Sequence, residues 1–350
     1  MSFSERTSTL VAATARSTSV DLRTAAGLLA GARSVMVLAH VNPDADALGS
    51  ALALGLALER RGAQVVVSFA SPGMVPESLR HLPGQHLIRP AARIPDDLDL
   101  LVTMDVASVE RLGDLAALVG VVPTLVIDHH TSNTRFGTHH VVDPSAEATV
   151  VLVHLLLEQL GEPVTADAAA SLYAGLATDT AFFRNVTAHT HRLAAELVDS
   201  GADPVEVLRP IGDSHPFAWL PMLSTVLGRA ELDRTAVGGR GLVHTSVTTG
   251  DSAGLRQEEL DSIIDILRTA READVAVVGK EHDPGQWQIS LRGRPGIDVA
   301  AAAERLGGGG HVRAAGFSWD GTYPDAIDAL RAVLADQVPV GLSRPAAADS

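Results

Sequence analysis

The chain contains no cysteine among its 350 residues. Disulfide bridges, thiolate metal sites and a cysteine nucleophile are therefore excluded, and any metal site must use histidine and carboxylate ligands. Aromatic residues make up only 3% of the chain, so it has few of the aromatic platforms on which single-stranded nucleic acids stack. The hydrophobic cores must be built mainly from aliphatic side chains.

Positive charge is also in short supply, because 27 Lys and Arg residues face 42 Asp and Glu residues, which gives a formal net charge of -15. Such a charge repels a long nucleic acid, whereas a small phosphate ester held by metal ions is compatible with it. No segment approaches the roughly 18 apolar residues of a membrane span, and the start lacks the apolar core of a secretory signal. We therefore expect a cytoplasmic protein with no membrane partner.

The first half of the chain alternates short apolar runs with helical patterns. Residues 34–39 and 64–69 read as buried strands on either side of a helix over 47–61, and two further strands end at Asp105 and His130. This alternation predicts an α/β fold class, with a doubly wound, mostly parallel sheet covered by helices.

The second half has a different pattern. Two strands on either side of a turn at 283–285 predict a β-hairpin, and helices alternate with strands around it, which indicates a smaller α+β domain. Repeated prolines and glycines between the halves indicate a linker. The predicted organisation is a mobile start (1–30), a catalytic domain (31–195), a linker (196–221), a second domain (222–340) and a tail (341–350).

Residues that can bind metal follow the predicted strands. Each group has an ordinary explanation when taken alone, such as a helix cap, a solvated turn or the polar end of a buried strand. An acidic residue at the carboxyl end of a helix, however, opposes the helix dipole and needs another reason to be there. These residues are His40, Asp44, Asp46, Asp105, His129 of the run Asp128-His129-His130, and Asp179 at a helix end.

The carboxyl ends of parallel strands lie along one edge of a sheet, so we expect these side chains to converge. A mixture of imidazole and carboxylate suits Mn²⁺ or a similar divalent ion. Six ligands are too many for one ion with an open position, but they suit two ions about 3.5–4 Å apart that share a carboxylate.

Five ordered motifs carry a resemblance to a known family. The segments HVNPDADALGS (40–50), VTMD (102–105), IDHH (127–130) and ATDT (177–180) resemble the motifs of the DHH phosphoesterase superfamily. The segment GGGGHVRAAG (307–316) resembles the DHHA1 substrate-binding motif that accompanies it. The size and domain pair are most similar to bifunctional oligoribonucleases and phosphoadenosine phosphate phosphatases, some of which cleave cyclic dinucleotides or their linear products.

The resemblance implies a role for each residue of the metal cluster. One ion would be held by His40, Asp44 and Asp105, and the other by Asp46, Asp105, His129 and Asp179, with Asp105 bridging. Mn²⁺ is the expected ion, and Mg²⁺ and Co²⁺ accept the same ligands. Asp128 is expected to orient an imidazole. His130 is expected to contact the phosphate or the leaving oxygen, unless it only packs.

Other residues are candidates for substrate binding. Arg111 and Asn133 lie near the cluster in sequence and are expected to reach the phosphate, although Arg111 could equally be a solvated side chain. In the second domain, we expect a clamp for the part of the substrate away from the scissile phosphate, unless the glycine run is only a flexible loop. The clamp residues are Arg292, Gly309, Gly310 and His311.

The expected function is hydrolysis of short nucleotide substrates to nucleoside monophosphates. These substrates are cyclic or linear dinucleotides, short oligoribonucleotides and 3′-phosphoadenosine 5′-phosphate, and the resemblance also implies a homodimer. A single-strand-specific exonuclease would be expected to carry basic and aromatic surfaces, and a related pyrophosphatase would lack the glycine-histidine motif. A non-catalytic nucleotide sensor usually lacks a ligand, whereas here the set is complete.

Overall fold

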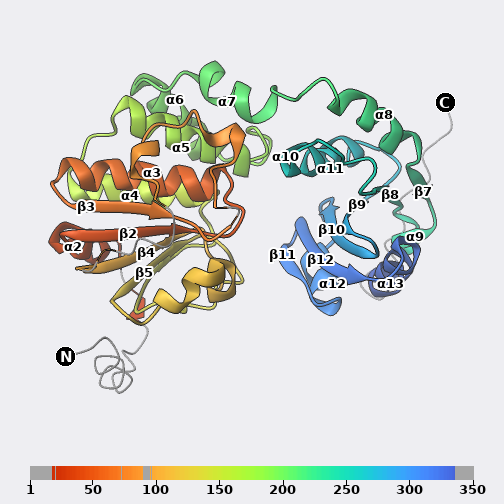
Figure 1. Cartoon of the computed structure of the whole chain (residues 1–350), viewed down its shortest axis with the longest axis horizontal. Coiled ribbons are helices and arrows are strands. Elements are labelled where there is room, and N and C mark those ends of the chain that lie inside the picture. The colour runs from red at the N-terminus through yellow and green to blue at the C-terminus, as the bar shows by residue number, and fades with distance from the viewer. Residues whose placement is uncertain (1–17, 20, 72, 90–94, 96, 336–350) are drawn as a thin grey trace. The chain divides into compact units, whose positions relative to one another are not determined.

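The computed structural model describes residues 18–19, 21–71, 73–89, 95 and 97–335. It divides into two compact units, with the boundary between Ser214 and His215 (Figure 1). The tail predicted over 341–350 and most of the mobile start predicted over 1–30 lie outside the described residues.

The first unit is built on a six-stranded parallel sheet with the order β1-β6-β5-β4-β2-β3. Its central strands are apolar and buried along their whole length, as expected of a parallel sheet covered on both faces. The strands are β1 (Thr18–Ser19), β2 (Ser34–Ala39), β3 (Gln64–Ser68), β4 (Leu100–Met104), β5 (Thr124–Asp128) and β6 (His139–Val142).

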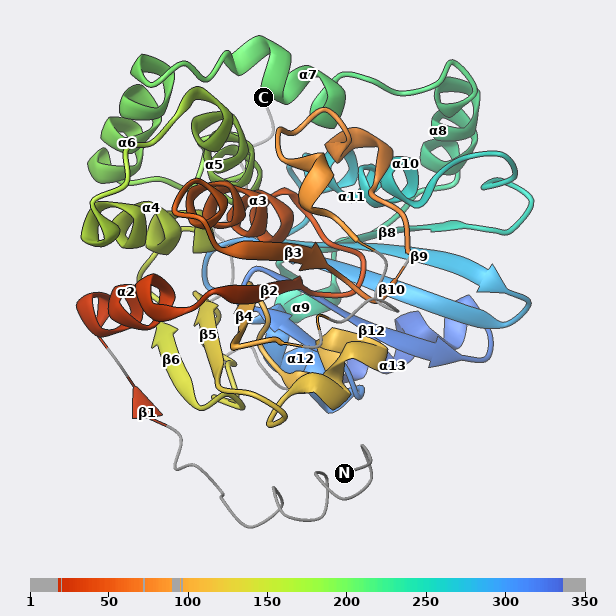
Figure 2. The same cartoon turned by 60° about the vertical axis from the view of Figure 1, so that its left-hand side comes forward.

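The two faces of this sheet are covered differently (Figure 2). One face packs against α2 (Leu22–Gly31), α3 (Ala45–Arg60) and α4 (Thr149–Leu160). The other packs against the 3₁₀ segment η3 (Val109–Leu118). Because β2 leads through α3 to β3 while β4 leads through η3 to β5, the strand order reverses between β2 and β4. The predicted doubly wound α/β fold is confirmed, and this reversal is where such folds bind ligands.

A close crossing of two helices completes the first unit. Helix α5 (Ala166–Asp179) packs on α3, where two glycines allow the backbones to approach. A Cβ at Gly49 would lie 2.4 Å from the carbonyl oxygen of Ser171, and a Cβ at Gly175 would lie 2.9 Å from the Cα of Asp46. The crossing therefore requires both positions to lack a side chain.

Two predicted boundaries need correction. Residues 22–31, placed in the mobile start, form α2, whose Ala25, Ala26 and Leu29 are buried in the core. The predicted linker over 196–221 is largely helical. Its prolines suggested irregular structure, but Pro204 and Pro221 lie in first helical turns, where the missing N–H is harmless. The helices here are α6 (Ala188–Asp199), α7 (Pro204–Gly212) and α8 (Trp219–Gly228).

The second unit contains a mixed six-stranded sheet with the order β11-β12-β10-β9-β8-β7. Only β8 and β9 are parallel neighbours, and β9 and β10 form the predicted hairpin. The strands are β7 (Glu231–Asp233), β8 (Leu242–Val247), β9 (Val275–Asp283), β10 (Gln286–Gly293), β11 (Gly309–His311) and β12 (Ala314–Asp320). The helices that follow α8 are α9 (Ala236–Gly239), α10 (Gln257–Asp261), α11 (Ile263–Leu267), α12 (Val299–Arg305) and α13 (Tyr323–Ala335).

The glycine run of the second unit is not a flexible loop. Gly307 has a φ of +81° and follows α12, and the N–H of Gly308 donates to the carbonyl of Ala303, so the first two glycines end the helix. The next two begin the edge strand β11. Within the described residues, no helix combines the length and the apolar character that crossing a membrane requires.

We predict that Gly49→Ala destabilises the first unit by about 1–3 kcal/mol, because the added methyl group meets the backbone of α5. Gly27→Ala is the matched control: Gly27 is an exposed position inside α2, where an added Cβ would meet nothing within 4 Å, so its alanine should stabilise by at most about 1 kcal/mol. Urea unfolding followed by circular dichroism measures the effect. The three Trp residues all lie in the second unit, so their fluorescence should report an unchanged transition. Equal stability of both variants would contradict the packing argument.

Candidate metal centre

His40 stands at the reversal point of the sheet, directly after β2. Its Nδ1 lies 2.7 Å from the carbonyl oxygen of Val41, so Nδ1 donates to the backbone and Nε2 is the ring nitrogen that faces the cluster. Nε2 is buried, at 3.5 Å from Oδ2 of Asp44 and 3.6 Å from Oδ2 of Asp105. These separations are long for hydrogen bonds, and they leave room for a cation among the three side chains.

Asp105 follows β4, the neighbouring strand, and it is shared by three groups of potential ligands, one of which also contains Asp128 and His130. One ligand atom from each of His40, Asp44 and Asp105 lies within 4.8 Å of the others, and the same is true of Asp46, Asp105 and His129. The backbone of Asp105 has a φ of +60°, a strained conformation for a residue other than glycine. The carboxylate oxygens of Asp105 lie 3.4–3.6 Å from ring nitrogens of His40, His129 and His130.

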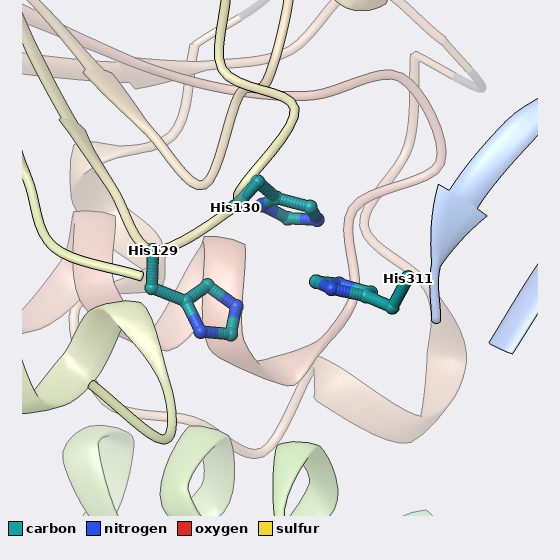
Figure 3. Close-up of side chains that lie close together, drawn as sticks. All are labelled: His129, His130 and His311. Carbon is teal, nitrogen blue, oxygen red and sulfur yellow. The ribbon is translucent and has the colours of Figure 1, made fainter. Parts of the chain in front are cut away.

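The run Asp128-His129-His130 ends β5, and its two rings meet edge to face with centroids 5.0 Å apart (Figure 3). His129 directs Nδ1 to the carbonyl of Ala146 at 3.1 Å and Nε2 toward Asp179 at 3.2 Å and Asp105 at 3.6 Å. Asp128 is fully buried, and its Oδ1 accepts from Nδ1 of His130 at 2.7 Å. Asp128 therefore orients His130, while His129 faces the carboxylates.

Asp46 lies in the first turn of α3 but reaches the first turn of α4. Its two carboxylate oxygens accept hydrogen bonds from the backbone N–H groups of Thr149, at 2.7 Å, and Val150, at 2.9 Å. Asp44 caps α3 itself, because its Oδ1 accepts from the N–H of Ala47 at 3.0 Å. Both acids are thus held by backbone donors in addition to any metal.

Asp179 is the last residue of α5, where it opposes the helix dipole. The chain then turns through three consecutive residues of positive φ, Ala181, Phe182 and Phe183. A left-handed residue other than glycine costs about 1–2 kcal/mol, so this turn stores strain beside the cluster. The strained turn and the acidic helix end are both explained if Asp179 serves a cation.

The electrostatics of the cluster are unbalanced. Burial and the negative charges of Asp105 and Asp179 hold the pKa of Asp46 well above its usual value. Burial and neighbouring carboxylates raise the pKa of Asp179 in the same way. Burial lowers the pKa of His40, but Asp44 and Asp105 outweigh it and raise the pKa to about 10. Asp46 and Asp179 therefore lack enough positive charge nearby in the protein alone.

A divalent ion fits this arrangement. The two imidazoles present Nε2 toward shared carboxylates because their other ring nitrogens are held by backbone carbonyls, which is the usual arrangement around a metal ligand. The buried Nε2 of His40 makes no hydrogen bond to the described part of the chain. Imidazole and carboxylate together are the donors that Mn²⁺ and related ions accept.

The two residues predicted to contact the phosphate, Arg111 and Asn133, have different surroundings in the structure. Arg111 is half-buried in η3, and its charge acts on both His40 and His130, so it lies near the cluster as expected. Asn133 is already engaged: its Nδ2 donates to Asp128 at 2.5 Å and to a backbone carbonyl, and its Oδ1 accepts from the N–H of Arg135. Asn133 therefore holds Asp128, and its contact with the substrate stays a prediction.

In the second unit, Arg292 and His311 are brought to one face of the sheet. Arg292 on β10 and His311 on β11 lie directly opposite Ala314 of β12, which pairs with both strands. Directly opposed residues of neighbouring strands project to the same face of a sheet. The next row consists of Ser290, Gly316 and Gly309, which leave that face without bulky side chains. We call this set of five residues and Ala314 the sheet platform.

The predicted clamp residues have different structural roles. A Cβ at Gly309 would meet nothing within 4 Å, so this position is open. A Cβ at Gly310 would lie 2.6 Å from the carbonyl oxygen of Ala314, so glycine is needed there for β11 to pair with β12. Strand pairing alone thus explains why residue 310 is a glycine, without the predicted substrate contact.

Burial lowers the pKa of Arg292, and the carboxylates of Asp265 and Asp261 offset this effect only in part.

Sequence reasoning missed Thr149, which is fully buried and whose hydroxyl donates to Asp105 at 2.9 Å. One signal was available. The helix starts after Ala148, a poor N-cap residue, so its first N–H groups had to find a partner elsewhere.

Comparisons with known proteins identify the family of both units. Residues 34–176 match the N-terminal domain of the DHH family, and residues 240–338 match the DHHA1 domain. The chain is 32% identical over 308 residues to the bifunctional oligoribonuclease and PAP phosphatase NrnA of Thermus thermophilus, with 86% of this chain and 90% of that protein covered.

Two further relatives extend the comparison. The chain is 27% identical to the cyclic-di-AMP phosphodiesterase GdpP of Geobacillus thermodenitrificans, covering 88% of this chain and 48% of that protein. In fold it is similar to an exopolyphosphatase-related protein of Bacteroides fragilis, with a TM-score of 0.82 and 21% identity over 91% of this chain and 96% of the other. The family matches and the shared length of the first relative lead to one conclusion. The chain belongs to the DHH family of phosphoesterases and carries a DHHA1 domain as its second unit.

Proposed function

We propose that this phosphoesterase is a two-metal hydrolase of short nucleotides. Its substrates would be linear or cyclic dinucleotides, short oligoribonucleotides and 3′-phosphoadenosine 5′-phosphate, with nucleoside monophosphates as products. The observation that carries the proposal is Asp105, which belongs to three groups of potential ligands, among them one with His40 and Asp44 and another with Asp46 and His129. A shared carboxylate between two dications reduces their mutual repulsion.

The ligand roles in this proposal are those that the family motifs imply. His40, Asp44 and Asp105 would hold one ion, and Asp105, Asp46, His129 and Asp179 would hold the other. Bound divalent ions would polarise the phosphoryl oxygens and increase the acidity of water at the site. We expect Mn²⁺, because imidazole and carboxylate are mixed in both groups.

We expect His130 to act on the phosphate itself. Burial lowers its pKa, but the hydrogen bond from Nδ1 to Asp128 and the nearby negative charges outweigh burial and raise it. Asp128 is in turn held by Asn133 and by the N–H groups of the two histidines. The raised pKa favours the protonated imidazole, and Asp128 fixes its direction, which suits a group that stabilises phosphate charge or protonates a leaving oxygen.

The second unit would bind the nucleoside part of the substrate on its sheet platform. Arg292 offers a half-buried guanidinium, His311 an imidazole, and the small residues between them a flat surface. The preference for small nucleotides is supported by the net charge of -15, which disfavours long polyanions, and by the names of the two relatives. The cytoplasmic location and the homodimer stay predictions.

The first test is a substrate panel. The purified full chain with Mn²⁺ should hydrolyse a linear diadenylate, short oligoribonucleotides and 3′-phosphoadenosine 5′-phosphate, with the highest kcat/KM on one of these short substrates. Protein treated with a chelator should be inactive until Mn²⁺ is returned. Preferential degradation of long single-stranded DNA would favour the exonuclease, and tight nucleotide binding without turnover would favour the sensor. Either result would refute the proposal.

We predict that Asp179→Asn stabilises the metal-free protein but weakens its binding of Mn²⁺. Removing the charge should raise the Tm of the metal-free protein, because it relieves both the carboxylate repulsion and the unfavourable helix end. The Kd for Mn²⁺ should weaken at least about tenfold, so added Mn²⁺ should raise the Tm of the variant less than that of the wild type. Thermal unfolding with chelator or with Mn²⁺ measures both effects.

Asp199→Asn is the control for that experiment. Asp199 is the exposed last residue of α6, so it has the same unfavourable position on its helix without the metal cluster. Its asparagine should stabilise by about 0.3–1 kcal/mol with and without Mn²⁺. If the two variants behave alike, Asp179 is not a metal ligand.

We also predict that Arg292→Gln raises the KM for a linear diadenylate about tenfold, because the loss of one charge-assisted hydrogen bond weakens binding by about that factor. Hydrolysis of bis(p-nitrophenyl) phosphate, which has no nucleoside, should be unchanged. Arg271→Gln removes an 87% exposed arginine of the same unit and should alter neither reaction. An equal loss on both substrates for Arg292→Gln would show that the platform has no role in binding the nucleoside.

A further inference from the structure

Helix α4 begins without a side-chain cap of its own. Ala148 occupies the N-cap position and provides no hydrogen-bonding side chain. It is also fully buried, so water cannot satisfy the first N–H groups of the helix. A buried N–H without a partner costs about 1–3 kcal/mol, so the helix start requires an acceptor from another part of the chain.

That acceptor is Asp46, which lies 103 positions before Thr149 in the sequence. Each of its oxygens takes one backbone N–H, from Thr149 and from Val150, so the plane of the carboxylate is fixed. On the other side, a Cβ at Gly175 would lie 3.0 Å from Oδ1 of Asp46. Asp46 is therefore clamped between the start of α4 and the middle of α5.

The side chain of Thr149 acts on a second acid. Its hydroxyl donates to Oδ1 of Asp105 at 2.9 Å, and both residues are buried. The preceding loop contributes as well, because the carbonyl of Ala146 lies 3.1 Å from Nδ1 of His129. One short stretch, residues 146–150, thus contacts all three members of the group formed by Asp46, Asp105 and His129.

We propose that Thr149 is a positioning residue of the metal centre: through its N–H it orients Asp46, and through its hydroxyl it orients the shared carboxylate of Asp105. This inference rests on the proposed function, because it assumes that the cluster holds divalent ions. Thr149 does not itself bind metal or substrate. It fixes which lone pairs the two carboxylates present to the ions.

The hydroxyl is the part of Thr149 that can be tested by substitution. A carboxylate oxygen has two lone pairs, so Oδ1 of Asp105 accepts from Thr149 and retains one for an ion. Without the hydroxyl, that carboxylate can rotate, and the geometry of the ligand groups that share it changes. In other metalloproteins, loss of such an outer partner typically weakens metal affinity or activity by about 10–100-fold.

The experiment compares Thr149→Val, which keeps the shape and the N–H but removes the hydroxyl, with Thr149→Ser, which keeps the hydroxyl. The control is Thr124→Val, another fully buried threonine, at the opposite end of β5 from the cluster. Mn²⁺ affinity of chelator-treated protein is measured by isothermal titration calorimetry, and the Tm of the metal-free protein is measured alongside. At saturating Mn²⁺, kcat and KM are determined with a linear diadenylate.

Thr149→Val should weaken the Kd for Mn²⁺ about 10–100-fold and lower kcat more than it changes KM. Thr149→Ser should stay within about threefold of the wild type, because the donor to Asp105 is retained. Thr124→Val should bind Mn²⁺ normally, whatever its Tm. Wild-type affinity in Thr149→Val, or equal losses in the valine and serine variants, would overturn the inference while leaving the proposed function intact. A wild-type protein that binds no divalent ion would refute both.

Discussion

Repulsion among buried carboxylates is the constraint under which the first unit is built. Asp46, Asp105 and Asp128 are buried at one edge of the sheet, and Asp179 faces the same cluster. Taking such charges out of water is unfavourable unless hydrogen bonds and opposite charges compensate. The surrounding structure can be understood as a set of partial compensations, which divalent ions would complete.

Each compensation comes from a different element of the fold. The helix start of α4 faces Asp46, the peptide groups after β5 face Asp128, and imidazoles from β2 and β5 face Asp105. The reversal of strand order between β2 and β4 brings these elements to one place, and the glycines at the crossing of α3 and α5 let them approach. The site is thus a property of the topology, and no single segment contains it.

The sequence predicted what depends on periodicity and strand order. Buried strands followed by polar residues were sufficient to place His40, Asp105 and the Asp128 run at one edge of a parallel sheet. The helical linker was not predicted, because Pro204 and Pro221 read as breaks unless their position in the first helical turn is known. The hydrogen bond from Asn133 to Asp128 was not predicted, because proximity in sequence does not show which acceptor an amide will find. For the same reason, the sequence did not predict the strand register that places Arg292 and His311 opposite Ala314.

The cap of α4 also determines when this helix can be complete. Asp46 is synthesised about a hundred residues before the N–H groups that it caps, and the chain between them must fold around the sheet before they meet. During synthesis, the first turn of α4 therefore lacks its acceptor until α3 and the sheet are in place. A local element whose ends are satisfied only by a distant one forms together with the tertiary structure, which raises the cooperativity of folding and slows the step that creates the site. The ligand geometry is consequently established in the same event as the native topology, and a partly folded nascent chain does not present it.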